Sequence, residues 1–285
     1  MSNNLQQLYP PPSSPLPLPL PLPRLYLEHP LHRLTADATP LVYSNFITSL
    51  DGRIALPRPG QASHGVPAAI GNARDWRLYQ ELAAQADLLI TSARYFRQYA
   101  SGEAQDTLPV STGERFADLR AWRLEQGLSA QPDIAVFSAS LDIPQAALQA
   151  YNTRRVHVLT GQNADAAKIA ALRAQGIEVH LAGAGTNVEG ALAIQTLHQL
   201  GYRRIYVIAG PAVFHTLVRA GMLQRLYLTL AHRILGGEDF DSLTWGSELQ
   251  PAPQLRLRSL FYDAYAPDDA GQLLTCYDLP ETLST

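Results

Sequence analysis

From residue 41 onward, short apolar runs alternate with segments of helical character, and this alternation constrains the fold more than any other feature of the chain. Nearly continuous apolar runs are typical of strands that are buried on both faces. Such runs occupy residues 41–47, 87–91, 134–138, 156–160, 204–209 and 225–231. Strands that alternate with helices over short links form a mostly parallel sheet flanked by helices, with ligands at the carboxyl ends of the strands. The sequence therefore predicts an α/β fold.

Helix boundary signals lie between these runs. Asn72 is suited to cap a helix, because apolar residues recur after it at helical spacing, namely Trp76, Tyr79, Leu82 or Ala83, and Ala86. Residues 186–189, TNVE, match a reciprocal capping box. Gly210-Pro211 predicts a further helix start, since proline is tolerated in the first turn. Helices are also expected over 114–126 and 164–175, and two alternating runs at 254–265 and 272–279 predict an antiparallel hairpin.

The N-terminal part of the chain has a different character. Residues 10–23 read PPPSSPLPLPLPLP, and proline at every second position excludes a helix and an interior strand. The alternation favours polyproline II. We divide the chain into a Pro/Leu-rich arm, 1–39, and a single domain, 40–285. The arm is expected to pack on its own protein or on a dimer partner; the alternative is a docking ligand for an aromatic groove.

Composition excludes several functional classes. The formal net charge of −3 and a pI near 6.2 argue against a general binder of nucleic acid or of anionic membranes. A single cysteine, Cys276, excludes an internal disulfide framework and a thiolate-cluster metal site. The sequence shows no signal-peptide pattern and no apolar stretch near the ~20 residues of a membrane span, so a cytoplasmic location is expected.

Hydroxyl and glycine residues follow three of the expected strands, where ligands of parallel sheets bind. Small residues there let backbone N–H groups approach a phosphate, and an arginine can pair with it. The candidates are Thr91, Ser92, Ala93 and Arg94 in one connection, Ser138 and Ser140 in a second, and Gly210, Pro211, Ala212 and Val213 at a helix start. Each motif alone is more typical of an ordinary loop or tight turn.

The segment 49–52, SLDG, is a turn signal between two apolar runs. It is either an ordinary turn or a turn on a cleft floor with Asp51 facing a ligand. The eight histidines are scattered, without a pair at metal spacing that a second ligand supports, so no metal site is expected. Neither a G-x-S-x-G elbow nor a P-loop is present. Hydrolase, kinase and metalloenzyme hypotheses therefore rank below a dinucleotide-using protein.

Five stretches occur in one order that is typical of a known family. They read SLDGRIA at 49–55, DLLITSA at 87–93, VFSASL at 136–141, IAGPA at 208–212 and AGMLQRLYLTLAHRILGG at 220–237. Together they resemble the reductase domain of bacterial riboflavin biosynthesis proteins, which has the dihydrofolate reductase fold. The resemblance covers residues from about 40 to 280 and also accounts for the C-terminal hairpin.

The resemblance implies an NADPH-dependent reductase similar to 5-amino-6-(5-phosphoribosylamino)uracil reductase, acting on a small-molecule substrate, and a homodimer. No catalytic residue is assigned, since hydride transfer is the cofactor's chemistry. The substrate would lie near Asn45, Ser49, Asp51 and Arg74. The cofactor would be bound by Thr91, Ser92, Ala93, Arg94, Ser138, Ser140, Thr160, Gly210, Pro211, Ala212 and Val213.

Several charges typical of the family are absent from this chain. Asn45 stands where the family usually carries lysine, and Ile208-Ala209-Gly210 stands for Glu-Gly-Gly. Ala83 and Ala139 replace arginines, and residues 95–102 replace an Asp-Asp-Pro run. Each loss removes a charge-assisted contact of roughly 1.5–3 kcal/mol, so a phosphoribosyl substrate would bind poorly without compensation.

Two further hypotheses remain open. The chain could be a catalytically silent nucleotide-binding protein that kept the fold and lost the substrate charges. It could also be an interaction module that works through the Pro-Leu arm. For compensation of the lost charges, the candidates are Arg74, Arg77 and Arg94.

Overall fold

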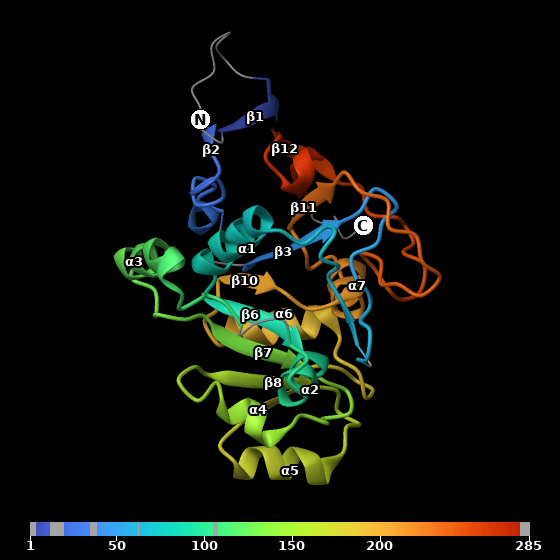
Figure 1. Ribbon diagram of the computed structural model, residues 1–285. Helices are drawn as coiled ribbons and strands as arrows, with labels where there is room; N and C mark the ends of the chain where they lie inside the picture. Colours follow the sequence, from blue (N-terminus) through green and yellow to red (C-terminus); the bar gives the residue numbers. More distant parts are fainter. Residues whose placement is uncertain (1–3, 12–19, 35–38, 62, 105–107, 280–285) are drawn as a thin grey trace.

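The computed structural model describes residues 4–11, 20–34, 39–61, 63–104 and 108–279. Within them, an 11-stranded sheet forms the centre of the molecule (Figure 1). Its strands, in order across the sheet, are β2 (Leu20–Pro21), β1 (Asn4–Tyr9), β12 (Arg256–Asp263), β13 (Gln272–Asp278), β11 (Arg225–Ala231), β3 (Leu41–Thr48), β10 (Arg204–Val207), β6 (Leu88–Ser92), β7 (Asp133–Phe137), β8 (Val156–Thr160) and β9 (Glu178–Leu181).

The sheet has a parallel and an antiparallel part. The strands from β11 to β9 all run parallel to their neighbours. At the other end, β13 is antiparallel to β11, and β12 is antiparallel to β13 with Phe261 opposite Leu274. The α/β class, the mostly parallel sheet and the C-terminal antiparallel hairpin agree with the sequence prediction.

Helices cover both faces of the sheet, because strands buried on both sides need apolar partners on both. One face packs against α1 (Ala73–Gln85), α2 (Ala93–Ala100), α3 (Ala117–Glu125), α4 (Gln145–Gln149) and α5 (Ala166–Ala174). The other face packs against α6 (Gly190–Gln199) and α7 (Pro211–Arg219). Shorter elements are the strand pair β4 (Leu56–Pro57) and β5 (His64–Gly65) and the 3₁₀ turns η1 (Leu31–Arg33), η2 (Glu114–Phe116) and η3 (Pro267–Asp269). None of the helices in the described ranges is long and apolar enough to cross a bilayer.

Two of the expected helix starts are confirmed. The Asn72 side chain accepts hydrogen bonds from the backbone N–H groups of Arg74 and Asp75, at 3.0 and 2.9 Å, and so caps α1. Gly210 is the N-cap of α7 and Pro211 its first residue. In both cases the local chemistry of the cap determines where the helix begins.

Two local expectations were wrong. The capping box at 186–189 does not form, because Glu189 accepts the Ala184 N–H at 2.7 Å and α6 starts only at Gly190. The connection from Thr91 to Arg94 is not a loop, since β6 ends at Ser92 and α2 begins at Ala93. The expected apolar face of α1 does pack on the core: Leu82, Ala83 and Ala86 are buried, and the partly buried Trp76 and Tyr79 pack against the same cluster. The polar Gln80, Glu81 and Gln85 are buried as well, which the sequence did not predict.

The described part of the N-terminal segment packs on its own chain. Asn4–Tyr9 adds an antiparallel strand to the outer edge of β12, and Leu22, Leu25 and Leu27 are buried in the core. Residues 12–19, which hold most of the Pro-Leu alternation, lie outside the described residues. Because β1 occupies the edge of β12, a second molecule cannot pair with that edge.

Buried polar side chains of α1 bind the backbone of this segment. Glu81 accepts hydrogen bonds from the N–H groups of Arg24 and Tyr26 at 2.6 and 2.9 Å. Gln85 accepts the Leu31 N–H at 3.3 Å and donates to the Tyr26 carbonyl at 2.7 Å. These contacts satisfy backbone groups that would otherwise be buried without partners.

Candidate functional site

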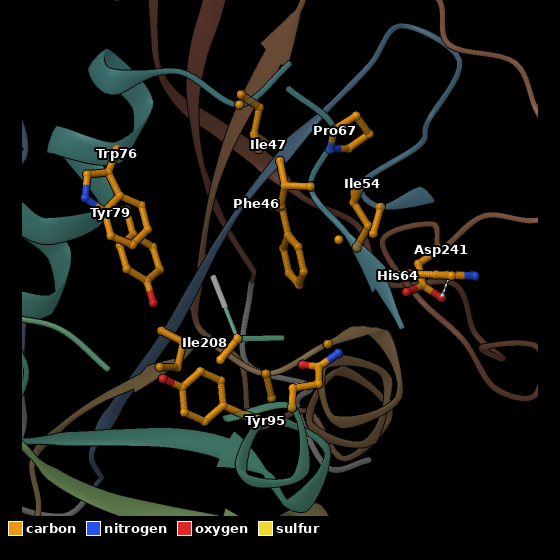
Figure 2. A pocket seen from close by; sticks show the side chains of 18 of the residues that line it. Phe46, Ile47, Ile54, His64, Pro67, Trp76, Tyr79, Tyr95, Ile208 and Asp241 are labelled. Carbon is orange, nitrogen blue, oxygen red and sulfur yellow. Dashed lines mark ion pairs between the residues drawn. The ribbon is translucent and has the colours of Figure 1, made fainter. Parts of the chain in front are cut away.

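A cavity of about 740 Å³ lies beside the carboxyl ends of β6 and β10 and against β3 and the start of α1 (Figure 2). This is the edge at which parallel sheets bind ligands. Ile54, Ala55, Arg58 and residues 64–67 line a further side of the cavity, and its volume is that of a small-molecule or cofactor site.

One wall of the cavity is aromatic. Trp76 and Tyr79 stack with ring centroids 4.8 Å apart and an interplanar angle of 15°. Figure 2 shows them on one side of the cavity, with Phe46 in the middle and Ile54 and His64 on the other side. Flat aromatic faces of this kind suit a planar ring system.

A buried carboxyl group lies in this wall. Asp75, in the first turn of α1, is 9% exposed, and its Oδ1 atom has no hydrogen-bond partner. Burial raises the pKa of Asp75 to about 6, although a hydrogen bond with Thr229 opposes this rise. A carboxyl with such a pKa is partly protonated near neutral pH, so it can donate a proton or a hydrogen bond to a ligand.

The opposite wall carries charged side chains. His64 lies 3.3 Å from Asp241 and 3.2 Å from Asp239, measured between ring nitrogens and carboxylate oxygens. Arg94 approaches Asp241 at 3.6 Å and remains 46% exposed. Arg94 can therefore meet an anion that enters from solvent, and Arg58 and Arg115 also line the cavity.

Two helix starts face the cavity. Ser92 and Arg94 line it at the start of α2, and Gly210 and Pro211 line it at the start of α7. Helix N-termini present backbone N–H groups and a positive dipole end, which favour phosphate. Together with the Arg94 guanidinium they form an anion-binding edge beside the aromatic wall.

The cavity brings together some of the residues expected from the sequence and not others. Those that line it are Asn45, Thr91, Ser92, Arg94, Gly210 and Pro211. Those that do not line it are Ser49, Asp51, Arg74, Ala93, Ser138, Ser140, Thr160, Ala212 and Val213.

Asp51 has structural partners. Its carboxylate accepts hydrogen bonds from the Ser49 hydroxyl at 2.5 Å and from the Gly236 N–H at 2.8 Å. These hydrogen bonds lower the pKa of Asp51 to about 2. The Asp-Gly turn thus anchors the loop after β11, with Gly52 at a φ of +82° where a side chain would be strained.

Other expected residues also lie outside the cavity. Arg74 donates to Asp263 at 2.7 Å. Ser138 accepts the Leu141 N–H at 3.0 Å, and Ser140 accepts the Asp142 N–H at 3.3 Å. Thr160 is fully buried, and its hydroxyl has no hydrogen-bond partner.

The structure accounts for several departures from the family pattern. Asn45 accepts a hydrogen bond from the Tyr206 hydroxyl, which leaves its amide NH₂ as the group that could bind a ligand. Ile208 lines the cavity as an apolar side chain. Ala83 is fully buried, and its carbonyl accepts from the buried Arg123 at 3.3 Å. An arginine at position 83 would therefore lie in the core and not in the cavity.

The most informative residues of the cavity were not identified from the sequence. Asp75 follows the cap Asn72 by three positions, in the first helical turn, where the helix dipole commonly favours an acidic residue. Trp76 and Tyr79 fit a helical core pattern equally well. His64 and Asp241 are distant in sequence and meet only in the fold.

Comparison with known proteins identifies a family. A model of the RibD C-terminal domain matches residues 40–266. No curated protein matches the sequence significantly. Among solved structures, a pyrimidine reductase-like protein from Corynebacterium diphtheriae is similar with a TM-score of 0.62 at 20% identity, over 85% of this chain and 92% of that chain.

Two further structures are similar at lower identity. RibD of Acinetobacter baumannii gives a TM-score of 0.56 at 15% identity, and the match covers 85% of this chain but 58% of that one. The riboflavin biosynthesis reductase Rib7 of Saccharomyces cerevisiae gives 0.55 at 14% identity, over 91% of this chain and 99% of that chain. At these identities the likeness concerns the fold, and it confirms the predicted fold class.

Proposed function

The chain belongs to the RibD C-terminal domain family, a pyrimidine reductase-like family of typically NAD(P)H-dependent enzymes, and from this we propose that it is an NADPH-dependent reductase of a planar nitrogen heterocycle. The substrate class is a pyrimidine or a related ring. One observation carries the proposal: a buried carboxyl group with an unpartnered oxygen, Asp75, lies in the aromatic wall of the cavity.

The residues present fit a dinucleotide. The starts of α2 and α7 and the Arg94 guanidinium would bind the phosphates. Thr91, Ser92, Gly210 and Pro211 would then lie close to the pyrophosphate of the cofactor. The adenosine end would extend along the ends of β7 and β8 toward Ser140, which is exposed, whereas Ser138 and Thr160 are buried. When bound, NADPH supplies a hydride, which is the chemistry that the side chains cannot provide.

Asp75 would provide the proton that accompanies the hydride. Reduction of a C=N or C=O bond needs a proton on the nitrogen or oxygen as negative charge develops there. The protonated carboxyl can donate it, and the ionised carboxyl can instead accept N–H groups of an amino-substituted ring. The aromatic faces of Trp76 and Tyr79 would orient the ring and exclude water from this step.

The substrate need not be phosphorylated. Asn45 and Ile208 replace a lysine and a glutamate typical of the family, and Ile208 presents an apolar surface to the cavity. We infer that the substrate is less charged than a phosphoribosylamino-pyrimidine. The test is NADPH oxidation in the presence of free pyrimidine and pteridine rings compared with their phosphoribosyl derivatives; faster turnover of the phosphorylated compounds would contradict the inference.

Arg94→Ala should weaken NADPH binding by about 10- to 100-fold, because a hydrogen bond to a charged group contributes about 1.5–3 kcal/mol. The measurement is calorimetric titration with NADPH and then with NADH. Arg97→Ala is the matched control, since Arg97 lies on the same helix and donates outside the cavity to the Asp142 carbonyl. Equal affinity of the wild type and Arg94→Ala would remove Arg94 from the cofactor site, and absence of any NADPH binding would overturn the reductase proposal.

The second candidate function is a silent nucleotide-binding protein. The replacement of the two family charges by Asn45 and Ile208 favours it. NADPH binding without oxidation by any ring compound would support this alternative against the reductase. We also propose a homodimer with β11 or the hairpin near its interface, which light scattering on the purified chain would test.

A further inference from the structure

Two histidines and a glutamate meet at the β8–β9 edge of the sheet, although they are dispersed in the sequence. His157 Nδ1 lies 3.1 Å from His180 Nε2 and 3.1 Å from Glu178 Oε2, and the last two atoms are 3.6 Å apart. No other group of three such side chains in the described ranges brings its ligand atoms so close. None of the three residues lines the 740 Å³ cavity.

The pairing of the strands explains the meeting. β8 and β9 are parallel neighbours, with His157 opposite Glu178 and Leu159 opposite His180. Glu178 and His180 are two residues apart, so their side chains leave the same face of β9. His157 faces them from the adjacent strand. The three residues have no recognisable metal spacing in the sequence, because only the strand register brings them together.

The buried histidine is held by further groups. His157 Nε2 lies 2.8 Å from the Tyr202 hydroxyl, which itself donates to Asp133 Oδ2 at 2.7 Å. Because the Tyr202 hydroxyl donates its hydrogen bond to the Asp133 carboxylate, its oxygen is left to accept a hydrogen bond from the Nε2–H group of His157. The Nδ1 lone pair then faces His180 and Glu178. Metal-ligating histidines characteristically have their other nitrogen fixed in this way.

The spacing matches a metal site. Tetrahedral zinc with bonds of about 2.0–2.1 Å separates its ligand atoms by about 3.3 Å. The three separations here lie on both sides of that value.

We propose that His157, Glu178 and His180 bind one divalent zinc-class cation, with a fourth position open to solvent beside the half-exposed Glu178. Two imidazoles and a carboxylate are a ligand set that zinc accepts. The ion would fasten the edge strand β9 to β8 and so protect an edge that is otherwise open to pairing with other chains. This site is independent of the proposed reductase activity.

The test uses the full chain, stripped with a chelator, freed of it and titrated with ZnCl₂ by calorimetry. The wild type should bind one Zn²⁺ per chain and show a higher melting temperature with zinc. Glu178→Gln and His180→Ala should each weaken binding at least about 10-fold or abolish it, and zinc should no longer raise their melting temperature. Tyr202→Phe should weaken it about 10- to 100-fold, as loss of the partner of a ligating histidine does.

The control is His198→Ala, which removes a histidine that contacts Arg203 and is not one of the three clustered residues, and it should leave zinc affinity unchanged. Zinc binding by the wild type that is no tighter than that of His180→Ala would overturn the proposal. So would an equal loss in His198→Ala, which would indicate unspecific binding to histidines. If His180→Ala fails to fold, Glu178→Gln decides, because the Glu178 side chain is 55% exposed.

Discussion

Replacing Asp75 with asparagine is expected to stabilise the protein at pH 7.5 by about 2–3 kcal/mol while reducing turnover about 10²- to 10⁴-fold. The folded-state pKa of Asp75 is about 6, above the 3.8 of an unperturbed aspartate, because burial disfavours its charge. A group whose pKa is raised on folding favours the folded state most at low pH. This contribution is lost as the pH rises from about 4 through 6.

The asparagine variant has no charge to bury. The difference in free energy of unfolding between the variant and the wild type should therefore grow over that pH range and vanish below pH 4. Denaturant unfolding at a series of pH values measures it. Turnover of the wild type should fall above pH 6 as the acid ionises, and the variant should lose this dependence. Asp142→Asn, an exposed aspartate outside the cavity, is the control and should change neither property. If the difference in stability between the wild type and Asp75→Asn does not depend on pH, folding does not raise the pKa of Asp75.

Glu81→Ala should destabilise the protein by about 3–5 kcal/mol. The side chain is fully buried, and its two oxygens accept the Arg24 and Tyr26 N–H groups as well as Arg77 at 2.7 Å. Truncation leaves the two backbone N–H groups and the Arg77 guanidinium without these hydrogen bonds. Buried polar groups without partners lower the free energy of unfolding more than the loss of an ordinary contact does.

Chemical unfolding and limited proteolysis measure this effect, and cleavage within residues 20–34 should precede global unfolding. Asp118→Asn is the matched control, because Asp118 pairs with the same Arg77 at 2.5 Å but is 48% exposed. Its loss should cost less than about 1 kcal/mol, as for exposed ion pairs. Similar losses in both variants would mean that the ion pair, and not the binding of the N-terminal backbone, carries the stability.

The features that the sequence predicted well depend on local chemistry. The apolar runs became strands, Asn72 became a helix cap, and Gly210-Pro211 became a helix start, because each outcome depends on neighbours along the chain. Cap residues and strand periodicity act within a few positions. For the same reason the α/β class could be predicted before any contact was known.

The features that the sequence did not predict depend on distant partners. Trp76 and Tyr79 have the spacing of core residues, and only the cavity distinguishes a wall from a core. Glu81 is a typical surface residue of a helix until the N-terminal segment covers it. In a capping box Glu189 would accept a hydrogen bond from the Thr186 N–H. In the structure it accepts one from the Ala184 N–H, which is further away in the sequence. Periodicity cannot reveal which element covers a helix face.

The strand β1 has a consequence for the order of assembly. Gln6 pairs with Tyr262 on β12, so two segments far apart in the sequence must meet to form this edge of the sheet. Closing so long a loop is entropically costly, and contacts between distant segments form late. During synthesis the N-terminal segment leaves the ribosome long before β12 exists, so β1 has no strand to pair with on that side until the C-terminal hairpin has been made.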